Sequence, residues 1–224
     1  MSTAKIRPFD ETDRSELRTL FARAGDGAPP GSFLGHPEAE ASVYLDPYMD
    51  LEPESLFVAE ADGALVGYLT GCLDSATFPS EGARMELAIR KYRLALRPQS
   101  MVFFGRAIAD TVRTKLRKEP ATEDFDDARW PSHLHINVAP EARGTGAGSA
   151  LMEAWFDRWT QAGSPGCYLQ TLVENPGAVR FFQRMGFTAY GSTPLVPGVR
   201  YNGKRLHQQT MVQAAPNRDA GASH

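Results

Sequence analysis

The chain has 224 residues, of which 42% are hydrophobic and 23% are charged, and its formal net charge is -3. These values are typical of a globular protein and allow one large domain with a sizeable core. A weakly acidic chain lacks the basic surface that nucleic-acid binding requires, and no stretch approaches the roughly 20 apolar residues of a membrane span.

The two cysteines, Cys72 and Cys167, do not form a closely spaced pair. A disulfide or zinc framework is therefore not expected, and a reducing cytoplasm fits best. The acidic residues from 10 to 13 stand where a signal peptide would need an apolar run, so no export signal is expected.

The N-terminal region predicts short elements followed by a hairpin. In chain order, they are a strand at Lys5–Phe9, a helix capped by Asp13 with the stripe Leu17, Leu20 and Phe21, a loop at Gly25–Gly35 and an amphipathic segment at Glu38–Tyr48. The clearest signal is Asp62-Gly63, a tight-turn pair between two β-rich runs. It predicts antiparallel strands at Phe57–Glu60 and Leu65–Leu73.

Residues 79–130 have a different composition and predict a helical insertion. From Arg84 to Lys118 only Glu86 and Asp110 oppose the positive charge. Two stripes recur at helical spacing, separated by Pro98: Met85, Ile89, Tyr92 and Leu96, then Phe104, Ile108, Val112 and Leu116. An acidic loop follows from residue 119 to 127, and we interpret the basic face as a solvated helix face rather than a binding surface.

Regular alternation of elements resumes after Trp130-Pro131. The predicted elements are a strand at His133–Val138, a helix at Gly148–Ala162 with the stripe Leu151, Trp155 and Trp159, a strand at Cys167–Val173, a helix from Asn175-Pro176 to Gly186, and strands at Phe187–Tyr190 and Arg205–Val212. Asn202-Gly203 predicts a turn before the last strand. Residues 1–213 form one predicted domain, and the small, polar residues 214–224 predict a disordered tail.

A glycine-rich turn joins the strand at His133–Val138 to the following helix. Backbone N–H groups at a helix N-terminus form an anion site, and glycine lets phosphates approach closely. The glycines at 144, 146 and 148 fit neither G-x-G-x-x-G nor a P-loop, which disfavours a nucleotide-binding reading. The run from Arg143 to Gly148 instead resembles R/Q-x-x-G-x-G/A, the pyrophosphate-binding signature of the GNAT acetyltransferase superfamily.

A second motif strengthens this resemblance. The run from Asn175 to Phe187 is similar to the family's N-x-x-A-x-x-F-[YF]-x-x-x-G-F signature, and it begins 32 positions after Arg143 (175 − 143). The resemblance implies a mixed, mostly antiparallel α/β sheet that splays between two parallel strands, with helices on both faces. It also implies acetyl-CoA as the acyl donor and a primary amine as the acceptor.

The resemblance assigns the coenzyme-binding residues. They are Ile136, Val138, Arg143, Gly144, Thr145, Gly146, Ala147, Gly148, Ser149, Asn175, Ala178, Phe181, Phe182 and Arg184. In this assignment Ile136 and Val138 pair with pantetheine through their backbones, and residues 143–149 hold the pyrophosphate. Arg180 and Arg184 either face the phosphates or lie in solvent.

Direct attack by an amine requires a base, an oxyanion donor and a way to release the thiolate. His133, His135 and Asn137 share one face of a regular strand, so His135 is the first candidate base and His133 the second, against the alternative of hydrogen-bonded core histidines. His-x-His lacks a third ligand nearby, so no metal is expected. Many relatives carry tyrosine where this chain has Phe182; Tyr190 or Tyr201 are possible substitutes, or the thiolate needs no acid.

The missing tyrosine leaves two functions open. One is an active N-acetyltransferase acting on a small amine, an amino sugar or a lysine; the other is an inactive acyl-CoA-binding module. The runs starting at Asp46, Gly67 and His133 further resemble the acetyltransferase-like domain of O-GlcNAc hydrolases and its free-standing bacterial relatives. The acceptor and the choice between monomer and homodimer are not encoded in any motif that we recognise.

Overall fold

One sheet of eight strands organises the structure, a computed structural model that describes residues 4–24 and 32–215. The strands are β1 (Lys5–Pro8), β2 (Leu56–Ala61), β3 (Ala64–Cys72), β4 (Ser132–Val138), β5 (Gly166–Leu172), β6 (Thr188–Tyr190), β7 (Leu195–Tyr201) and β8 (Lys204–Ala214). Their order is β1-β2-β3-β4-β5-β8-β6, with β7 also paired to β8. Every pairing is antiparallel except β4 with β5.

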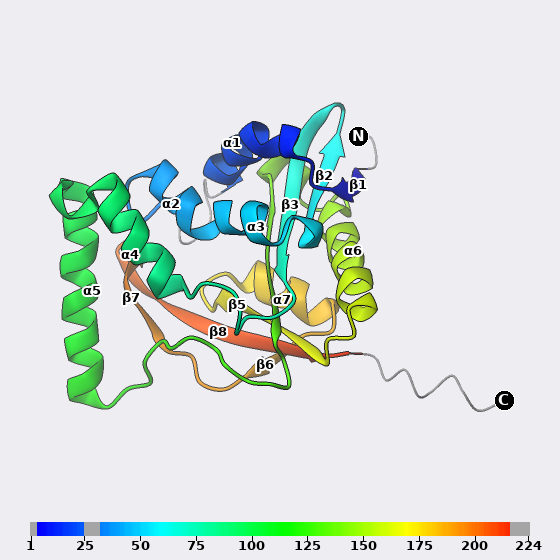
Figure 1. Cartoon of the computed structure of the whole chain (residues 1–224). Helices are drawn as coiled ribbons and strands as arrows, with labels where there is room; N and C mark the ends of the chain where they lie inside the picture. The colour runs from blue at the N-terminus through cyan, green and yellow to red at the C-terminus, as the bar shows by residue number, and fades with distance from the viewer. Residues whose placement is uncertain (1–3, 25–31, 216–224) are drawn as a thin grey trace.

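Seven α-helices accompany the sheet within the described residues. They are α1 (Arg14–Ala24), α2 (Pro37–Tyr44), α3 (Asp46–Leu51), α4 (Glu81–Tyr92), α5 (Pro98–Arg117), α6 (Ala147–Gln161) and α7 (Pro176–Arg184). None of these helices is both long enough and apolar enough to cross a membrane. The sheet and these helices confirm the predicted mixed α/β architecture with helices on both faces (Figure 1).

Alternation along the strands produces two cores, because successive side chains point to opposite faces of the sheet. On one face, Leu69 and Leu134 pack with Trp155 of α6 and Phe182 of α7. On the other face, Val58 and its neighbours pack against α1 and α3, and a third, smaller cluster joins α2 to α4 and α5. The sheet is thus covered on both sides around β4, where the predicted site lies.

The hairpin and the helix of the second motif form as predicted. Asp62 and Gly63 have φ values of 52° and 78°, which are the positive φ angles of the tight turn that joins β2 to β3. Asn175 caps α7 by accepting a hydrogen bond from the Ala178 N–H at 3.2 Å. These features depend on neighbouring residues only, which explains why local sequence predicts them.

Four predictions need correction or fall partly outside the described residues. Asp13 is not the helix cap; Asp10 caps a short 3-10 turn that leads into α1, while Asp13 accepts from the Asp10 N–H and pairs with Arg7. The segment at residues 38–48 divides into α2 and α3. Strand β7 was not predicted, and Ala214 belongs to β8 rather than to a tail. Residues 216–224 and residues 25–31 of the predicted loop lie outside the described residues.

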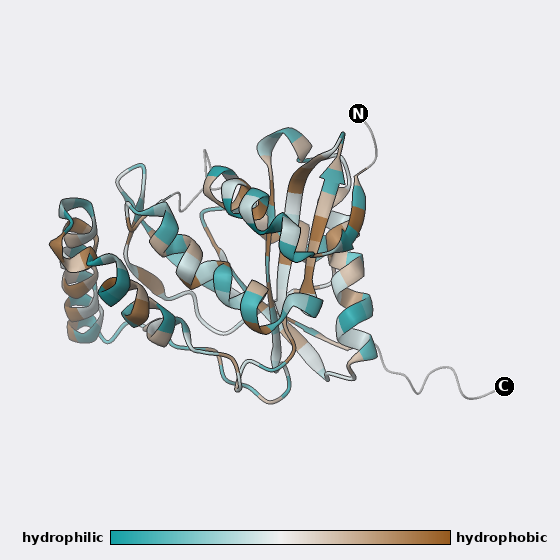
Figure 2. Ribbon diagram, turned by 45° about the horizontal axis from the view of Figure 1, so that its top comes forward, coloured by the Kyte–Doolittle hydropathy of each residue, from teal (hydrophilic) through white to brown (hydrophobic). Residues whose placement is uncertain are grey.

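The insertion is helical as predicted, but of its second apolar stripe only Phe104 packs against a buried cluster. Ile108, Val112 and Leu116 on α5 are 67%, 52% and 80% exposed. Helix α5 packs instead on β7 through a face that includes Phe103 and Asp110, at the edge of the molecule (Figure 2). The periodicity predicted the helix correctly without indicating which side of it is buried.

Candidate coenzyme and acyl-transfer site

The two parallel strands β4 and β5 form a fork. They pair only at Ser132 with Cys167 and at His133 with Tyr168, although both strands continue for several residues beyond these pairs. β4 remains paired to β3 from His133 to Val138, and among the described strands none pairs with its far edge from residue 134 onward. The fork therefore exposes one strand edge inside the sheet, and this is the predicted splay.

Backbone alternation determines which amides of β4 face the fork. The Ala139 N–H donates to the Val66 carbonyl at 2.8 Å, and so it points toward β3. Because N–H groups alternate between the two edges of a strand, those of Val138, Ile136 and Leu134 point away from β3 and into the fork. Ile136 and Val138 thus present their backbones where the resemblance expects an extended ligand.

The glycine-rich loop lies where β4 meets α6. Gly144 and Gly146 have φ values of 80° and 93°, a backbone conformation that favours glycine, and a Cβ atom on either would contact nothing within 4 Å. Gly146 is the N-cap of α6, and no side chain caps this helix. The first-turn N–H groups of α6 therefore face open space at the positive end of the helix dipole.

The remaining loop residues shape this turn. The exposed Arg143 donates from its Nε to the Val138 carbonyl at 3.2 Å, and the Thr145 hydroxyl donates to the Ala142 carbonyl at 2.7 Å. Ala147 is buried, whereas Gly148 and Ser149 are half-buried. These two short contacts link the loop to the end of β4 and to the turn that precedes it.

Helix α7 closes the other side of the loop. A Cβ atom on Gly148 would approach the Phe181 ring to 3.4 Å, so α6 and α7 touch at this glycine. Ala178 and Phe181 are half-buried beside the core, whereas Phe182 is buried within it, near Phe187. Arg180 and Arg184 are both exposed.

His133 is held at both ring nitrogens. Its Nε2 lies 2.8 Å from the Tyr48 hydroxyl, and its Nδ1 lies 2.6 Å from the Ser75 hydroxyl. Burial, the nearby His135 and Arg84 lower the pKa of His133 well below its ordinary value. Because both nitrogens are engaged, this side chain is positioned like a structural histidine.

His135 lies on the same face of β4 and is less constrained. Its ring packs edge-on against Tyr48 and His133, with centroid separations of 5.6 and 5.8 Å, and no hydrogen bond joins it to another described residue. Burial and the charge of Arg84 lower the pKa of His135 to about 4. The imidazole is therefore neutral near pH 7, and the same burial makes it a weaker base than a free histidine.

The other two predicted catalytic residues have different surroundings. The Asn137 amide donates to the Tyr68 hydroxyl at 2.7 Å, which ties β4 to β3. The Tyr190 hydroxyl accepts from Arg129 at 2.9 Å, and its ring packs against Trp130 and Phe125. The structure does not bring Tyr190 into contact with either histidine of β4 among the described residues.

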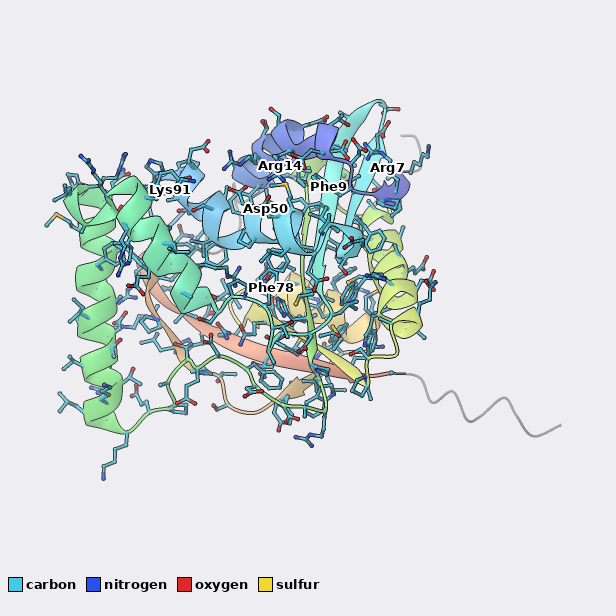
Figure 3. All side chains as sticks on the ribbon, viewed as in Figure 1. Arg7, Phe9, Arg14, Asp50, Phe78 and Lys91 are labelled. Carbon is cyan, nitrogen blue, oxygen red and sulfur yellow. The ribbon has the colours of Figure 1, made fainter. Side chains whose placement is uncertain are left out.

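Sequence analysis missed several side chains around the histidines. Tyr168 stands opposite His133 at the base of the fork, with ring centroids 5.5 Å apart, and burial raises the pKa of its hydroxyl. Arg84 reaches from α4 over the rings of Tyr48 and Phe78, and Phe78 is labelled below α3 in Figure 3. Only Tyr168 had a usable signal, because it lies on the strand predicted to run parallel to the histidine strand.

Comparison with known proteins agrees with this geometry. Residues 107–189, which include the fork, the glycine loop and α7, match the family model of the acetyltransferase (GNAT) domain. The structure of SsHAT is similar at a TM-score of 0.61 and 20% identity, covering 96% of this chain and 100% of the other.

Two further similar structures contain the coenzyme. The structure of yncA from Salmonella typhimurium with its cofactor acetyl-CoA gives a TM-score of 0.59 at 15% identity, covering 100% of each chain. A GNAT superfamily phosphinothricin acetyltransferase from Sinorhizobium meliloti, in complex with acetyl-CoA, gives 0.59 at 16% identity, covering 96% of this chain and 89% of the other. The chain therefore has the GNAT acetyltransferase fold, and its residues 107–189 have the sequence pattern of the GNAT acetyltransferase domain.

Proposed function

We propose that this protein is an acetyl-CoA-dependent N-acetyltransferase that acts on a primary amine by direct attack. The observation that carries the proposal is the fork between β4 and β5, which opens beside an uncapped, glycine-rich helix N-terminus. Two similar structures that contain acetyl-CoA support the same assignment.

The residues present fit acetyl-CoA at both of its distinctive parts. Gly144 and Gly146 leave open space where a Cβ would otherwise stand, and the α6 amides offer donors to a diphosphate. The backbone of Ile136 and Val138 offers a strand edge to an extended amide chain. When bound, the coenzyme supplies an activated thioester, and the protein has to orient it and manage the protons.

His135 is the base in this proposal. A neutral imidazole accepts the ammonium proton, directly or through one water, and then the free amine can attack. His133 is hydrogen-bonded on both sides and so is better suited to orienting its neighbours than to taking the proton. A backbone N–H facing the fork near Val138 is placed to stabilise the oxyanion.

Thiolate release does not use Phe182, which is apolar and buried. Tyr168 is a better-placed proton donor than Tyr190, because it lies at the base of the fork and burial keeps its hydroxyl protonated. A thiolate with an ordinary pKa of about 8.5 can also leave unprotonated. Tyr168 therefore adds to the proposal without being required by it.

The second candidate function is an inactive acyl-CoA-binding module, which the phenylalanine at position 182 favours. The two functions share the glycine loop and differ only in turnover. Calorimetric titration with acetyl-CoA tests binding, and thiol release with a broad panel of amines tests transfer. Binding with thiol release supports the enzyme; tight binding without release across the panel supports the module, and no binding defeats both.

Several finer assignments belong to the same proposal. They are the resemblance to the acetyltransferase-like domain of O-GlcNAc hydrolases, a single domain over residues 1–213, a cytoplasmic location and a monomeric or homodimeric state. The cytoplasmic assignment is supported by the two buried cysteines, Cys72 and Cys167, which remain free thiols. The small amine, the amino sugar and the lysine remain open as acceptors.

A further inference from the structure

A cavity of about 610 Å³ lies between the C-terminal half of α5 and the β7–β8 hairpin. Its lining is dominated by basic side chains from both elements and includes one carboxylate, that of Glu119. The basic side chains are Arg113, Arg200, Lys204, Arg205 and His207. A cavity with this lining has a positive potential, which attracts anions.

A buried carboxylate behind the cavity fixes two of the arginines. Asp110 is 2% exposed; its Oδ1 accepts from Arg200 at 2.8 Å and from Arg205 at 3.1 Å, and its Oδ2 accepts from the Gly198 N–H at 3.0 Å. Burial opposes ionisation, but these hydrogen bonds outweigh it and keep the pKa of Asp110 below its ordinary value. Asp110 therefore holds the guanidinium groups in place and neutralises only one of their two charges.

Two other cations of the cavity have no partner. The side chains of Arg113 and Lys204 make no hydrogen bond or ion pair within the described part of the chain, and Arg113 is half-buried. An arginine side chain that has no acceptor of its own can pair with an arriving oxyanion through charge-assisted hydrogen bonds. This arrangement differs from a surface where each arginine already has its carboxylate.

One residue of the cavity lining, His207, also contacts the segment at the end of β5, on the open side of the fork. His207 pairs with Glu174 at 2.8 Å, and the His207 carbonyl accepts from the Val173 N–H at 2.9 Å, directly beyond the end of β5. Glu174 immediately precedes Asn175, the cap of α7. His207 thus connects the cavity lining to the segment between β5 and α7.

We propose that this cavity binds an oxyanion group, phosphate or carboxylate, of the amine acceptor. The inference rests on the proposed function, because it places the acceptor's anionic end in the cavity while its amine reaches the fork. Arginine pairs with the two oxygens of either anion through parallel N–H groups, so the shared chemistry is a group with at least two anionic oxygens. The acceptor class is therefore an amine that also carries a phosphate or a carboxylate.

The first test measures anion binding without catalysis. Inorganic phosphate and succinate are titrated calorimetrically into the full-length chain, into the double variant Arg113→Ala with Lys204→Ala, and into Arg106→Ala. The exposed Arg106 is the matched control, because it lies on α5 outside the cavity lining. We expect the double variant to bind at least one probe about tenfold more weakly, a loss of about 1.4 kcal/mol, and the control to match the wild type. Equal binding in all three proteins, or none, would overturn the site, and the stronger probe distinguishes phosphate from carboxylate.

The second test asks whether the acceptor uses the cavity. Acetylation is compared for amino alcohol phosphates of increasing chain length, for amino acids of matching length and for the parent amino alcohols. We expect KM to be at least tenfold lower for an anionic amine, and the double variant to remove this advantage while kcat stays within twofold. Anion binding without any such KM difference would show a separate anion site and overturn the acceptor assignment. If no amine is acetylated, the proposed function fails, and calorimetric binding of the same amines still decides whether the cavity selects the anionic ones.

Discussion

Helices α6 and α5 have similar apolar patterns but different roles in the fold. On α6, the predicted stripe of Leu151, Trp155 and Trp159 is 0% to 1% exposed. On α5, Ile108, Val112 and Leu116 follow the same kind of spacing, yet each is more than half exposed. The spacing of apolar residues therefore predicted correctly that both segments are helical, but it predicted the buried face of α6 only.

The difference comes from what each helix packs against. Helix α6 covers the central strands of the sheet, where a broad apolar surface is available. Helix α5 packs on the β7–β8 hairpin at the edge and, near its N-terminal end, on the small cluster around Leu34. Its buried residues are Ser100, Asp110 and Thr114. A helix that packs on a small surface at the edge of a sheet can bury polar side chains, provided that each buried polar group has a hydrogen-bond partner.

The largest expected effect concerns the coenzyme loop at the start of α6. We predict that Gly146→Glu weakens acetyl-CoA binding by at least about 1,000-fold, or about 4 kcal/mol, because bulk and negative charge would occupy the phosphate space. The matched control is Gly163→Glu, which has a positive φ of 72° and open surroundings beyond the other end of α6. Calorimetry should show normal affinity for the control; equal loss in both variants would indicate backbone strain instead.

A matched leucine substitution tests the packing of α6. We predict that Leu151→Ala lowers the free energy of unfolding by about 4 kcal/mol, because it leaves a cavity beneath the sheet. Leu151 is fully buried, so little relaxation is available to fill the space. Urea unfolding monitored by circular dichroism measures the change, and a loss below 1 kcal/mol would show that α6 is loosely packed.

The buried side of α5 should depend on its carboxylate. We predict that Asp110→Ala lowers the free energy of unfolding by about 3 kcal/mol, because it removes the acceptor for Gly198, Arg200 and Arg205 inside a buried site. Asp110→Asn keeps one acceptor oxygen and should lose less. If both variants unfold like the wild type, the polar face is not what holds α5 in place.

His135 should affect both the turnover of the enzyme and the pH dependence of its stability. We predict that His135→Gln lowers kcat by about 100-fold, with little change in acetyl-CoA affinity, because it removes the base but leaves the loop intact. The folded pKa of about 4 lies below the ordinary value of 6.5, so between these pH values the unfolded chain binds a proton that the folded chain does not. Stability therefore falls as the pH is lowered through this window.

The variant should reduce that part of the pH dependence of unfolding. Between pH 7 and pH 5, the variant should lose less of its free energy of unfolding than the wild type loses. Matched urea titrations at the two pH values measure both losses. A kcat that is unchanged in the variant would remove His135 from the mechanism, whatever its effect on stability.

The smallest effect is expected on the exposed stripe of α5. We predict that Leu116→Ala changes the free energy of unfolding by less than about 0.5 kcal/mol, because alanine and leucine have similar helix propensities and the site is 80% exposed. Leu116→Ala and Leu151→Ala are the same substitution at an exposed site and at a buried site, so the difference in their effects measures the contribution of burial. A loss comparable to that at Leu151 would mean that the stripe is covered in solution.

Features that depend on neighbouring residues could be predicted from the amino-acid sequence. The Asp62-Gly63 turn, the glycine loop before α6 and the Asn175 cap of α7 are local, since backbone φ preference and short-range hydrogen bonds decide them. Alternation along β4 likewise placed both histidines on one face.

The distant partners of the site residues could not be predicted, because they depend on how the chain packs. His133 meets Tyr48 from 85 positions away, and Asp110 meets Arg205 from 95 positions away. Nothing in the local pattern of either segment specifies such contacts, because they follow from how the sheet and the insertion pack. The same reason separates α6 from α5: periodicity makes a helix, but the surface that it meets decides which side becomes the core.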